Sequence, residues 1–180
     1  ARLALQKAAE SSFNMQIRED ALYNFAVLSY ELDINPYNDA ILAFEKYLAE
    51  FPTSKRKEDV YQYLVNVYTS TNNYAKALES LDRVQSKDVK LRRAYQLVSY
   101  NYGIELYQKS QYEEAIKVFD KVDKYPINAQ LSAKAKFWSA DASFQLKNYS
   151  TAINGYRAFL SMTGIPNNDW RGNGYYNLGY

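Results

Sequence analysis

Few residues of this chain could carry out chemistry. Glu113 and Glu114 form an acidic pair, and paired carboxylates can serve as general acid and base. Adjacent residues on a helix point in different directions, and acidic residues stabilise the first turn of a helix, which explains this pair more simply. The sequence has no cysteine and no histidine, which excludes thiol chemistry, histidine triads and zinc sites built on these residues. We expect no enzyme, no catalytic residue, no metal and no cofactor.

The charges of the chain favour no nucleic acid and no anionic membrane. There are 22 basic and 20 acidic residues, which gives a net charge of +2. The basic cluster Lys55-Arg56-Lys57 is followed at once by Glu58 and Asp59, as is common on solvated surfaces. A nucleic-acid site needs a basic stripe with interleaved aromatic residues, and no such stripe is present. No apolar run approaches the ~18 residues of a transmembrane helix.

A short motif recurs along the chain and predicts a repeat protein. It reads Tyr-x-x-Ala-(Ile or Leu)-x-x, followed by a large apolar residue. Its alanines, at positions 40, 77, 115 and 152, are 37, 38 and 37 residues apart, and Ala1 lies 39 residues before Ala40. The chain has only 6 glycines and 4 prolines, which favours long helices. The motif begins at Tyr37, Tyr74, Tyr112 and Tyr149.

Each repeat is predicted to contain two helices. The motif opens the second helix, and the first helix precedes it, with a small residue where the two must approach closely. Those small residues are Ala26, Val65, Gly103 and Ala140. Pro52, Pro126 and Pro166 follow second helices, where proline stops a helix, and Pro36 lies in a longer loop, 33–36. The expected helices are 1–13, 18–32, 37–50, 55–71, 74–86, 89–109, 112–124, 128–147, 149–162 and 168–180.

These signals resemble the tetratricopeptide repeat (TPR) family. The family pattern of Trp-x2-Leu-Gly-x2-Tyr, Ala-x3-Phe and Pro is similar to Tyr175-x2-Leu178-Gly179, Ala40-x3-Phe44, Ala115-x3-Phe119 and Pro52. The resemblance implies an all-α fold, an α-α superhelix (solenoid) of antiparallel helix pairs, with about four full units and a half unit at each end. The expected single array over 1–180 consists of half unit 1–16, units 17–53, 54–87, 88–127 and 128–166, and half unit 167–180.

A narrower resemblance concerns bacterial cell envelopes. Residues 44–52 and 156–160 look like segments of the envelope group that includes the Tol-Pal coordinator and the outer-membrane assembly lipoproteins. The sequence of the whole chain is most similar to those of large TPR proteins of the Bacteroidetes. This resemblance implies a periplasmic or outer-membrane-associated protein.

The TPR resemblance also implies a binding groove lined by the first helices. An Asn at the position of Asn24, Asn101 and Asn177 contacts the ligand backbone in peptide-binding members, since an amide both donates and accepts hydrogen bonds. Packing between repeats explains the aromatic residues of this groove equally well. The expected ligand or partner-binding residues are Tyr23, Asn24, Tyr30, Tyr63, Asn66, Tyr100, Asn101, Tyr107, Phe137, Trp138, Asp141, Phe144, Tyr176 and Asn177.

The composition of this groove indicates the kind of partner. It lacks the Lys/Arg set of TPR carboxylate clamps, with Lys134 as a lone candidate, so an apolar or mixed peptide is favoured. We expect a non-enzymatic protein–protein interaction scaffold. Because tyrosine and tryptophan also stack on sugar rings, the alternative is an envelope module that binds glycan or peptidoglycan.

The last residues, 175–180, are apolar and fit the opening of another first helix. We expect this segment to pack on the helix at 149–162 and to leave one flank exposed. A terminal repeat normally has a polar outer face. We therefore expect the protein to continue beyond Tyr180, or another copy to cover this end by self-association.

Overall fold

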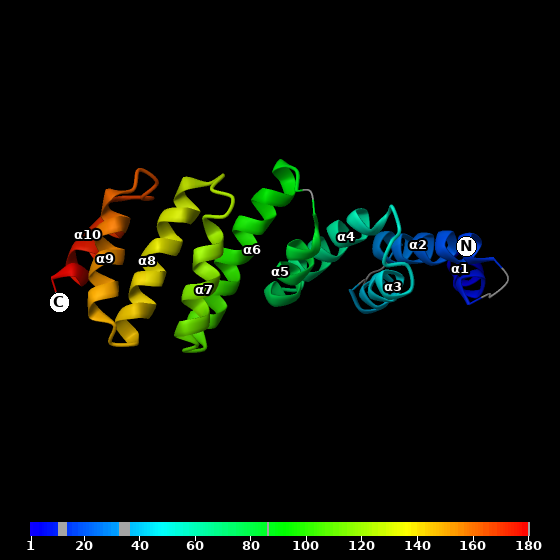
Figure 1. The fold of residues 1–180 in the computed structure, drawn as a ribbon, viewed down its shortest axis with the longest axis horizontal. Coiled ribbons are helices and arrows are strands. Elements are labelled where there is room, and N and C mark those ends of the chain that lie inside the picture. Colours follow the sequence, from blue (N-terminus) through cyan, green and yellow to red (C-terminus); the bar gives the residue numbers. More distant parts are fainter. Residues whose placement is uncertain (11–13, 33–36, 86, 180) are drawn as a thin grey trace. The chain divides into compact units, whose positions relative to one another are not determined.

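The computed structural model describes residues 1–10, 14–32, 37–85 and 87–179 of the chain. Within these ranges the regular structure is entirely helical, and consecutive helices pack against one another as pairs (Figure 1). The predicted all-α fold of helix pairs is therefore confirmed. The described helices are α1 (Arg2–Ala9), α2 (Met15–Leu32), α3 (Tyr37–Glu50), α4 (Lys57–Ser70), α5 (Tyr74–Arg83), α6 (Val89–Gln108), α7 (Tyr112–Val122), α8 (Ala129–Gln145), α9 (Tyr149–Ser161) and α10 (Asn168–Leu178).

The helix bounds follow the predicted ones closely. Helix α5 ends at Arg83 rather than at residue 86, because Val84 is extended, with φ −67° and ψ 120°. Helix α1 ends at Ala9 rather than at residue 13. The loop 33–36 with Pro36, residues 11–13 and Tyr180 lie outside the described residues.

The chain divides into two compact units, Ala1–Gln85 with α1 to α5 and Ser86–Tyr180 with α6 to α10. The division falls beside the expected boundary between repeats 54–87 and 88–127. A single array over the whole chain stays a prediction, as do the bounds of the individual repeats.

Small residues lie between paired helices in both units, as the repeat predicts. Ala26, Val65 and Ala140 from first helices are each at most 2% exposed. At Gly103 on α6, a Cβ atom would lie only 2.5 Å from Cε1 of Phe119 on α7. The buried alanines of the second helices, each at most 2% exposed, are Ala40, Ala77, Ala115 and Ala152.

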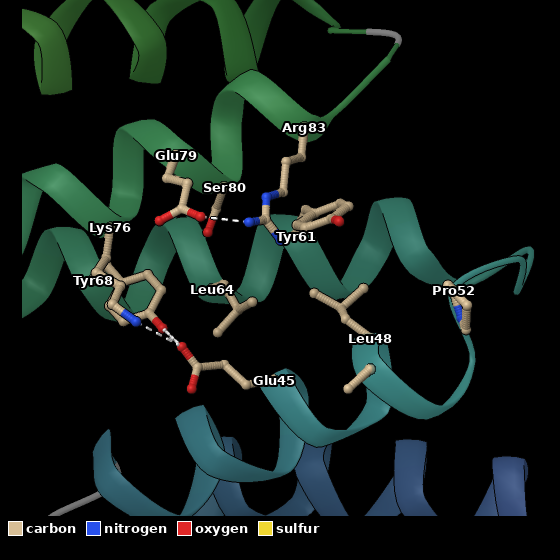
Figure 2. Close-up of a pocket in the computed structure, with 11 residues that line it drawn as sticks. Glu45, Leu48, Pro52, Tyr61, Leu64, Tyr68, Lys76, Glu79, Ser80 and Arg83 are labelled. Carbon is tan, nitrogen blue, oxygen red and sulfur yellow. Dashed lines mark hydrogen bonds and ion pairs between the residues drawn. The ribbon is translucent and has the colours of Figure 1, made fainter.

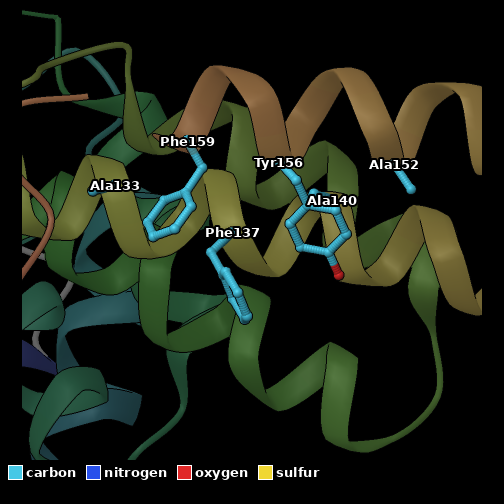
Figure 3. Close-up of a cluster of buried hydrophobic side chains, with 6 residues drawn as sticks. All are labelled: Ala133, Phe137, Ala140, Ala152, Tyr156 and Phe159. Atoms are coloured by element: carbon cyan, nitrogen blue, oxygen red, sulfur yellow. The ribbon is translucent and has the colours of Figure 1, made fainter. Parts of the chain in front are cut away.

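The core of the second unit contains a cluster of aromatic rings between α8 and α9 (Figure 3). Phe137 on α8 meets Tyr156 and Phe159 on α9 edge-on, with ring centroids 5.6 and 5.3 Å apart. Edge-to-face pairs of this kind add about 0.5–1.5 kcal/mol each beyond the burial of their area. The ring of Trp170 on α10 packs on that of Phe137, with centroids 5.2 Å apart, so this cluster joins α8, α9 and α10.

Three turns from a first to a second helix, within the described residues, share one backbone conformation. Asn72, Ser110 and Lys147 have positive φ values of 56°, 58° and 61°, and they are spaced as the repeat is. At Ser110 the backbone N–H donates to the carbonyl of Tyr107 at 2.9 Å, and the next N–H, of Gln111, donates to Leu106 at 2.9 Å. This pair of bonds closes the end of α6 as a Schellman motif, although glycine is the usual residue there.

Side-chain caps explain where several helices begin. The side chain of Asp88 accepts from the N–H of Leu91 at the start of α6. Asparagine side chains at 73, 128 and 167 do the same for α5, α8 and α10. Such a cap satisfies an N–H that the helix itself cannot pair and contributes about 1 kcal/mol.

Two polar networks tie packed segments together, one in each unit. In the first, Tyr47 on α3 is fully buried, and its hydroxyl donates to Glu19 on α2 at 2.7 Å. In the second, the fully buried Gln96 on α6 accepts from the N–H of Asn128 at 2.7 Å and donates to its carbonyl at 3.0 Å. Each network satisfies polar groups that would otherwise destabilise the helix interface.

Helix α10 confirms the predicted helix near the end of the sequence. It packs on α9, where a Cβ atom at Gly174 would lie 2.8 Å from Phe159. One flank is open, since Tyr175 is 60% exposed. No helix in the described part of the chain is both long enough and apolar enough to span a membrane.

Candidate functional site

A pocket of about 310 Å³ in the second unit combines several of the predicted groove residues. We call it the Asp141 pocket. It is formed by α8, α9 and α10. Its lining residues are Asp141, Phe144, Gln145, Tyr156, Tyr176 and Asn177, of which Asp141, Phe144, Tyr176 and Asn177 were predicted.

Helical spacing brings the lining residues together. Asp141, Phe144 and Gln145 stand at i, i+3 and i+4 on α8, which places them on one face of that helix. Tyr156 is anchored in the aromatic core by its ring, and its hydroxyl projects toward Asp141. Packing of α10 on α9 then brings Asn177 over the same carboxylate.

Asp141 is the centre of a hydrogen-bond network among four helices. One carboxylate oxygen, Oδ1, accepts from the hydroxyl of Tyr156 at 2.9 Å and from the amide of Asn177 at 3.4 Å. The other, Oδ2, accepts from the hydroxyl of Tyr107 on α6 and from the amide of Gln145 at 3.4 Å. Asn177 also donates to the oxygen of Tyr156 at 3.0 Å. The two phenol bonds are therefore the strong ones, and the two amide contacts are weak.

The phenols of this network are held in their neutral form. Burial raises the pKa of Tyr107 and of Tyr156 well above the ordinary value of 10, and their hydrogen bonds to Asp141 raise the pKa further. Both hydroxyls therefore stay protonated at neutral pH and act as donors. The negative charge of the pocket belongs to Asp141.

Two aromatic rings at the pocket are open to solvent. Tyr176 is 64% exposed, and Phe144 is 36% exposed beside the ring of Tyr149 at 5.5 Å. Rings with this much free surface can stack on a ligand without first giving up core packing. The arrangement offers a carboxylate, two amides and two solvent-exposed aromatic rings around one hollow.

The prediction that Phe137 lines an open groove is wrong. Its ring is only 7% exposed, because α9 and α10 enclose it in the aromatic cluster. Trp138 is half-buried and packs on Tyr107 at 4.9 Å. Tyr100 and Asn101 are also half-buried, and the ring of Tyr100 lies 6.3 Å from that of Phe119. Much of the predicted aromatic strip on α6 and α8 therefore stabilises helix packing.

The predicted residues of the first unit do not form a comparable pocket among the described residues. Tyr30 packs edge-on against Tyr63 at 5.1 Å, and Tyr63 stacks on the buried Phe44 at 5.1 Å. Tyr23 is half-buried, with the guanidinium of Arg56 4.9 Å above its ring.

The two predicted polar positions of the first unit are open to solvent. Asn66 is exposed. Asn24 is exposed as well, and its amide donates to the carbonyl of Asp20 in its own helix at 2.8 Å.

A larger pocket in the first unit lies where the sequence predicted nothing (Figure 2). Its volume is about 430 Å³, and it lies among α3, α4 and α5. Its charges are paired: Glu45 accepts from Lys76 at 3.2 Å and from the hydroxyl of Tyr68, and Glu79 pairs with Arg83 at 2.5 Å.

A second hollow, of about 320 Å³, occupies the same place one repeat earlier, among α1, α2 and α3. Its residues correspond in register to those of the larger pocket: Gln6 stands for Glu45, Phe25 for Leu64 and Lys46 for Arg83. Recurrence of the hollow at the same place in successive repeats indicates a gap left by helix stacking. The paired charges of the larger pocket leave no obvious preference for a ligand. The Asp141 pocket is therefore the better candidate.

A comparison with protein families agrees with the repeat pattern. Residues 3–54 match the family model described as tetratricopeptide repeat. This match supports a TPR protein, and repeats of this family generally mediate protein–protein interaction and are typically non-catalytic. It covers α1 to α3, so the Asp141 pocket lies outside the matched residues. No curated protein and no solved structure matches the chain, so the expected similarity to envelope proteins of the Bacteroidetes has no support from a relative.

Proposed function

We propose that the second unit is a protein-interaction module that binds a peptide segment of its partner at the Asp141 pocket. The observation that supports this most is the convergence of four predicted groove residues, from two first helices, on one pocket. A pocket of about 310 Å³ is near the lower end of the range for small-molecule sites, which suits one or two side chains of a peptide. The family match supports a protein partner in general terms.

The exposed rings carry most of the expected binding energy. Aromatic side chains that are already ordered lose little entropy when a ligand covers them, and they dominate many interfaces. Tyr176 and Phe144 meet this description, because each is fixed on a helix and still open to solvent. The amide of Asn177 is placed to bond a peptide backbone beside them.

A displayed library of random decapeptides tests the proposal. Peptides are selected on the whole protein, and their affinities are then measured by calorimetry for the parent, Tyr176→Ala and Tyr175→Ala. Tyr175 is the matched control, because it is the neighbouring residue, is 60% exposed, and does not line the pocket. We expect Tyr176→Ala to weaken binding about tenfold or more, and Tyr175→Ala to change it less than about twofold. Equal effects of the two variants on every selected peptide would contradict the proposal.

The second candidate is a glycan, in particular a peptidoglycan fragment of a cell envelope. Exposed aromatic rings beside a carboxylate and amides also suit a sugar, which stacks on the rings and hydrogen-bonds through its hydroxyls. Calorimetry with muropeptides and neutral oligosaccharides separates the two candidates. Heat from a neutral oligosaccharide that disappears in Tyr176→Ala would favour the glycan over the peptide.

A further inference from the structure

The charge of the Asp141 pocket is acidic and is not balanced within its lining. Asp141 is the only formally charged residue among those that line the pocket, and the other five are neutral. Tyr156 is neutral at pH 7, because the ordinary pKa of a phenol is about 10 and burial raises the pKa of Tyr156 further. In the described part of the chain Asp141 forms no ion pair, whereas Glu45, Asp20, Glu79 and Glu105 each have a basic partner.

The carboxylate is particular to this repeat. The equivalent positions in the first helices of the other three full repeats are Val27, Asn66 and Ile104. Helix packing alone therefore requires no acid here, since two of the other repeats place an aliphatic side chain at the same point. A lone carboxylate at a helix junction costs desolvation energy unless something compensates for it.

The hydrogen-bond geometry leaves two places for a ligand on this carboxylate. A carboxylate has about four acceptor sites. The hydroxyls of Tyr107 and Tyr156 occupy one on each oxygen with strong bonds. The remaining two are met only by the 3.4 Å contacts from Gln145 and Asn177, whose amides can turn away. One replaceable contact on each oxygen is the pattern that a guanidinium fork matches.

The aromatic rings suit the same ligand. Phe144 and Tyr176 line the pocket together with Asp141, and both expose part of their rings. A cation over an aromatic face gains about 0.5–2 kcal/mol, and arginine stacks on such a face better than lysine does. A carboxylate and two solvent-exposed rings in one pocket therefore complement a planar cation.

From these observations, and resting on the function proposed above, we propose that the Asp141 pocket binds the side chain of an arginine in the partner peptide. The guanidinium replaces the amide contacts of Gln145 and Asn177 on Asp141 and stacks on the exposed aromatic rings. Lysine binds the same place more weakly, because its ammonium cannot bond both oxygens in a fixed fork. Acidic side chains are excluded by the charge of Asp141.

Nuclear magnetic resonance titration of the whole protein with capped tripeptides tests this. The probes are acetyl-Gly-Arg-Gly-amide, the lysine equivalent, and the citrulline equivalent, which has nearly the shape of arginine and no charge. The side-chain amide signals of Gln145 and Asn177 report the site directly. We expect saturable shifts with arginine, affinity several-fold weaker with lysine, and at least about tenfold weaker with citrulline.

Two variants separate the charge from the shape of the pocket. Asp141→Asn keeps an acceptor for one of the two phenols and removes the charge, and we expect it to weaken arginine binding at least about tenfold. Asp120→Asn is the matched control, because it makes the same change at an exposed position on α7 and should leave binding unchanged. If Asp141→Asn does not fold, Gln145→Lys places a cation beside Asp141 from an exposed position and should abolish binding of the arginine probe.

The outcomes distinguish this proposal from the more general one. Equal binding of the arginine and citrulline probes, or full binding of the arginine probe to both Asp141→Asn and Gln145→Lys, would overturn the arginine site. Library peptides that lose affinity in Tyr176→Ala but lack arginine would overturn it as well, while the peptide-binding function stands. If no library peptide depends on Tyr176 while the arginine probe still binds through Asp141, the peptide-binding function fails and the cation site remains.

Discussion

Replacing Gly103 by alanine tests the repeat register at a close contact between α6 and α7. Alanine is the better helix former, and the change would gain about 0.5–1 kcal/mol in an open helix. Here the new Cβ atom would lie 2.5 Å from Cε1 and 2.6 Å from Cδ1 of Phe119. Ordinary carbon contacts lie at about 3.5–4.0 Å, so the ring must move by about 1 Å. Phe119 is only 2% exposed, so it can move only by disturbing its neighbours.

Overpacking of a well-filled core typically costs about 1–3 kcal/mol. After the gain in helix propensity is subtracted, we expect Gly103→Ala to destabilise the second unit by about 1–2 kcal/mol. Urea unfolding followed by tryptophan fluorescence measures this unit selectively, since Trp138 and Trp170 are the only two tryptophans of the chain and both lie in it.

Gly172→Ala is the matched control, because no heavy atom lies within 4 Å of the added Cβ and the position is inside α10. It should stabilise the unit by up to about 1 kcal/mol. Phe119→Leu combined with Gly103→Ala should cost less than the sum of the two single changes, because a smaller side chain relieves the clash. If the two glycine variants shift the urea midpoint in the same direction, the close approach at Gly103 is refuted.

Three further predictions concern the turns and the buried networks. Ser110→Gly should stabilise the protein by about 1 kcal/mol, because Ser110 has a φ of 58°, which glycine adopts more readily. Lys109→Gly should destabilise it, because Lys109 has a φ of −84°. Equal shifts of the two variants in thermal melts would contradict this. Gln96→Leu should destabilise by about 1–3 kcal/mol in urea, because it leaves the backbone N–H of Asn128 unpaired, and an unchanged midpoint would show that these bonds contribute nothing. Burial raises the pKa of Tyr47 to about 12, so the stability that its protonated hydroxyl contributes is complete below pH 10 and is lost as the pH rises toward 12. Tyr47→Phe should therefore lose less stability than the parent between pH 8 and 11. An equal loss in both proteins would exclude this contribution of the Tyr47 hydroxyl.

The fold was predictable because its determinants are local and periodic. Alanines at 40, 77, 115 and 152 mark the second helices, and the small residues before them mark where each partner helix approaches. Any sequence with this spacing must bury the same stripe to form a core. The positive φ that recurs at three turns was not predicted, because Asn72, Ser110 and Lys147 share no residue type that signals it.

The candidate site was predictable only in part, because it depends on how helices rotate against one another. Asp141 and Asn177 were placed by register alone, and the structure brings them together. Phe137 has the register of Tyr23 and Tyr100, yet it is buried, since Trp170 and Phe159 happen to close over it. Tyr156 was overlooked because its position, four residues after Ala152, indicated core; its ring is core, and only its hydroxyl reaches the pocket.

The network at Asp141 also makes ligand occupancy and local opening of the chain interdependent. Helix α10 is held by its packing on α9 and by the contacts of Asn177, whose weaker bond goes to the carboxylate and whose stronger bond goes to Tyr156. Segments with few such restraints open most readily, and their amide protons exchange fastest with solvent. A ligand that binds only the closed arrangement adds its binding free energy to the cost of opening. Amide protons across α10 should therefore exchange more slowly when a ligand is bound. Their exchange rates would report ligand binding at Asp141 from a different helix.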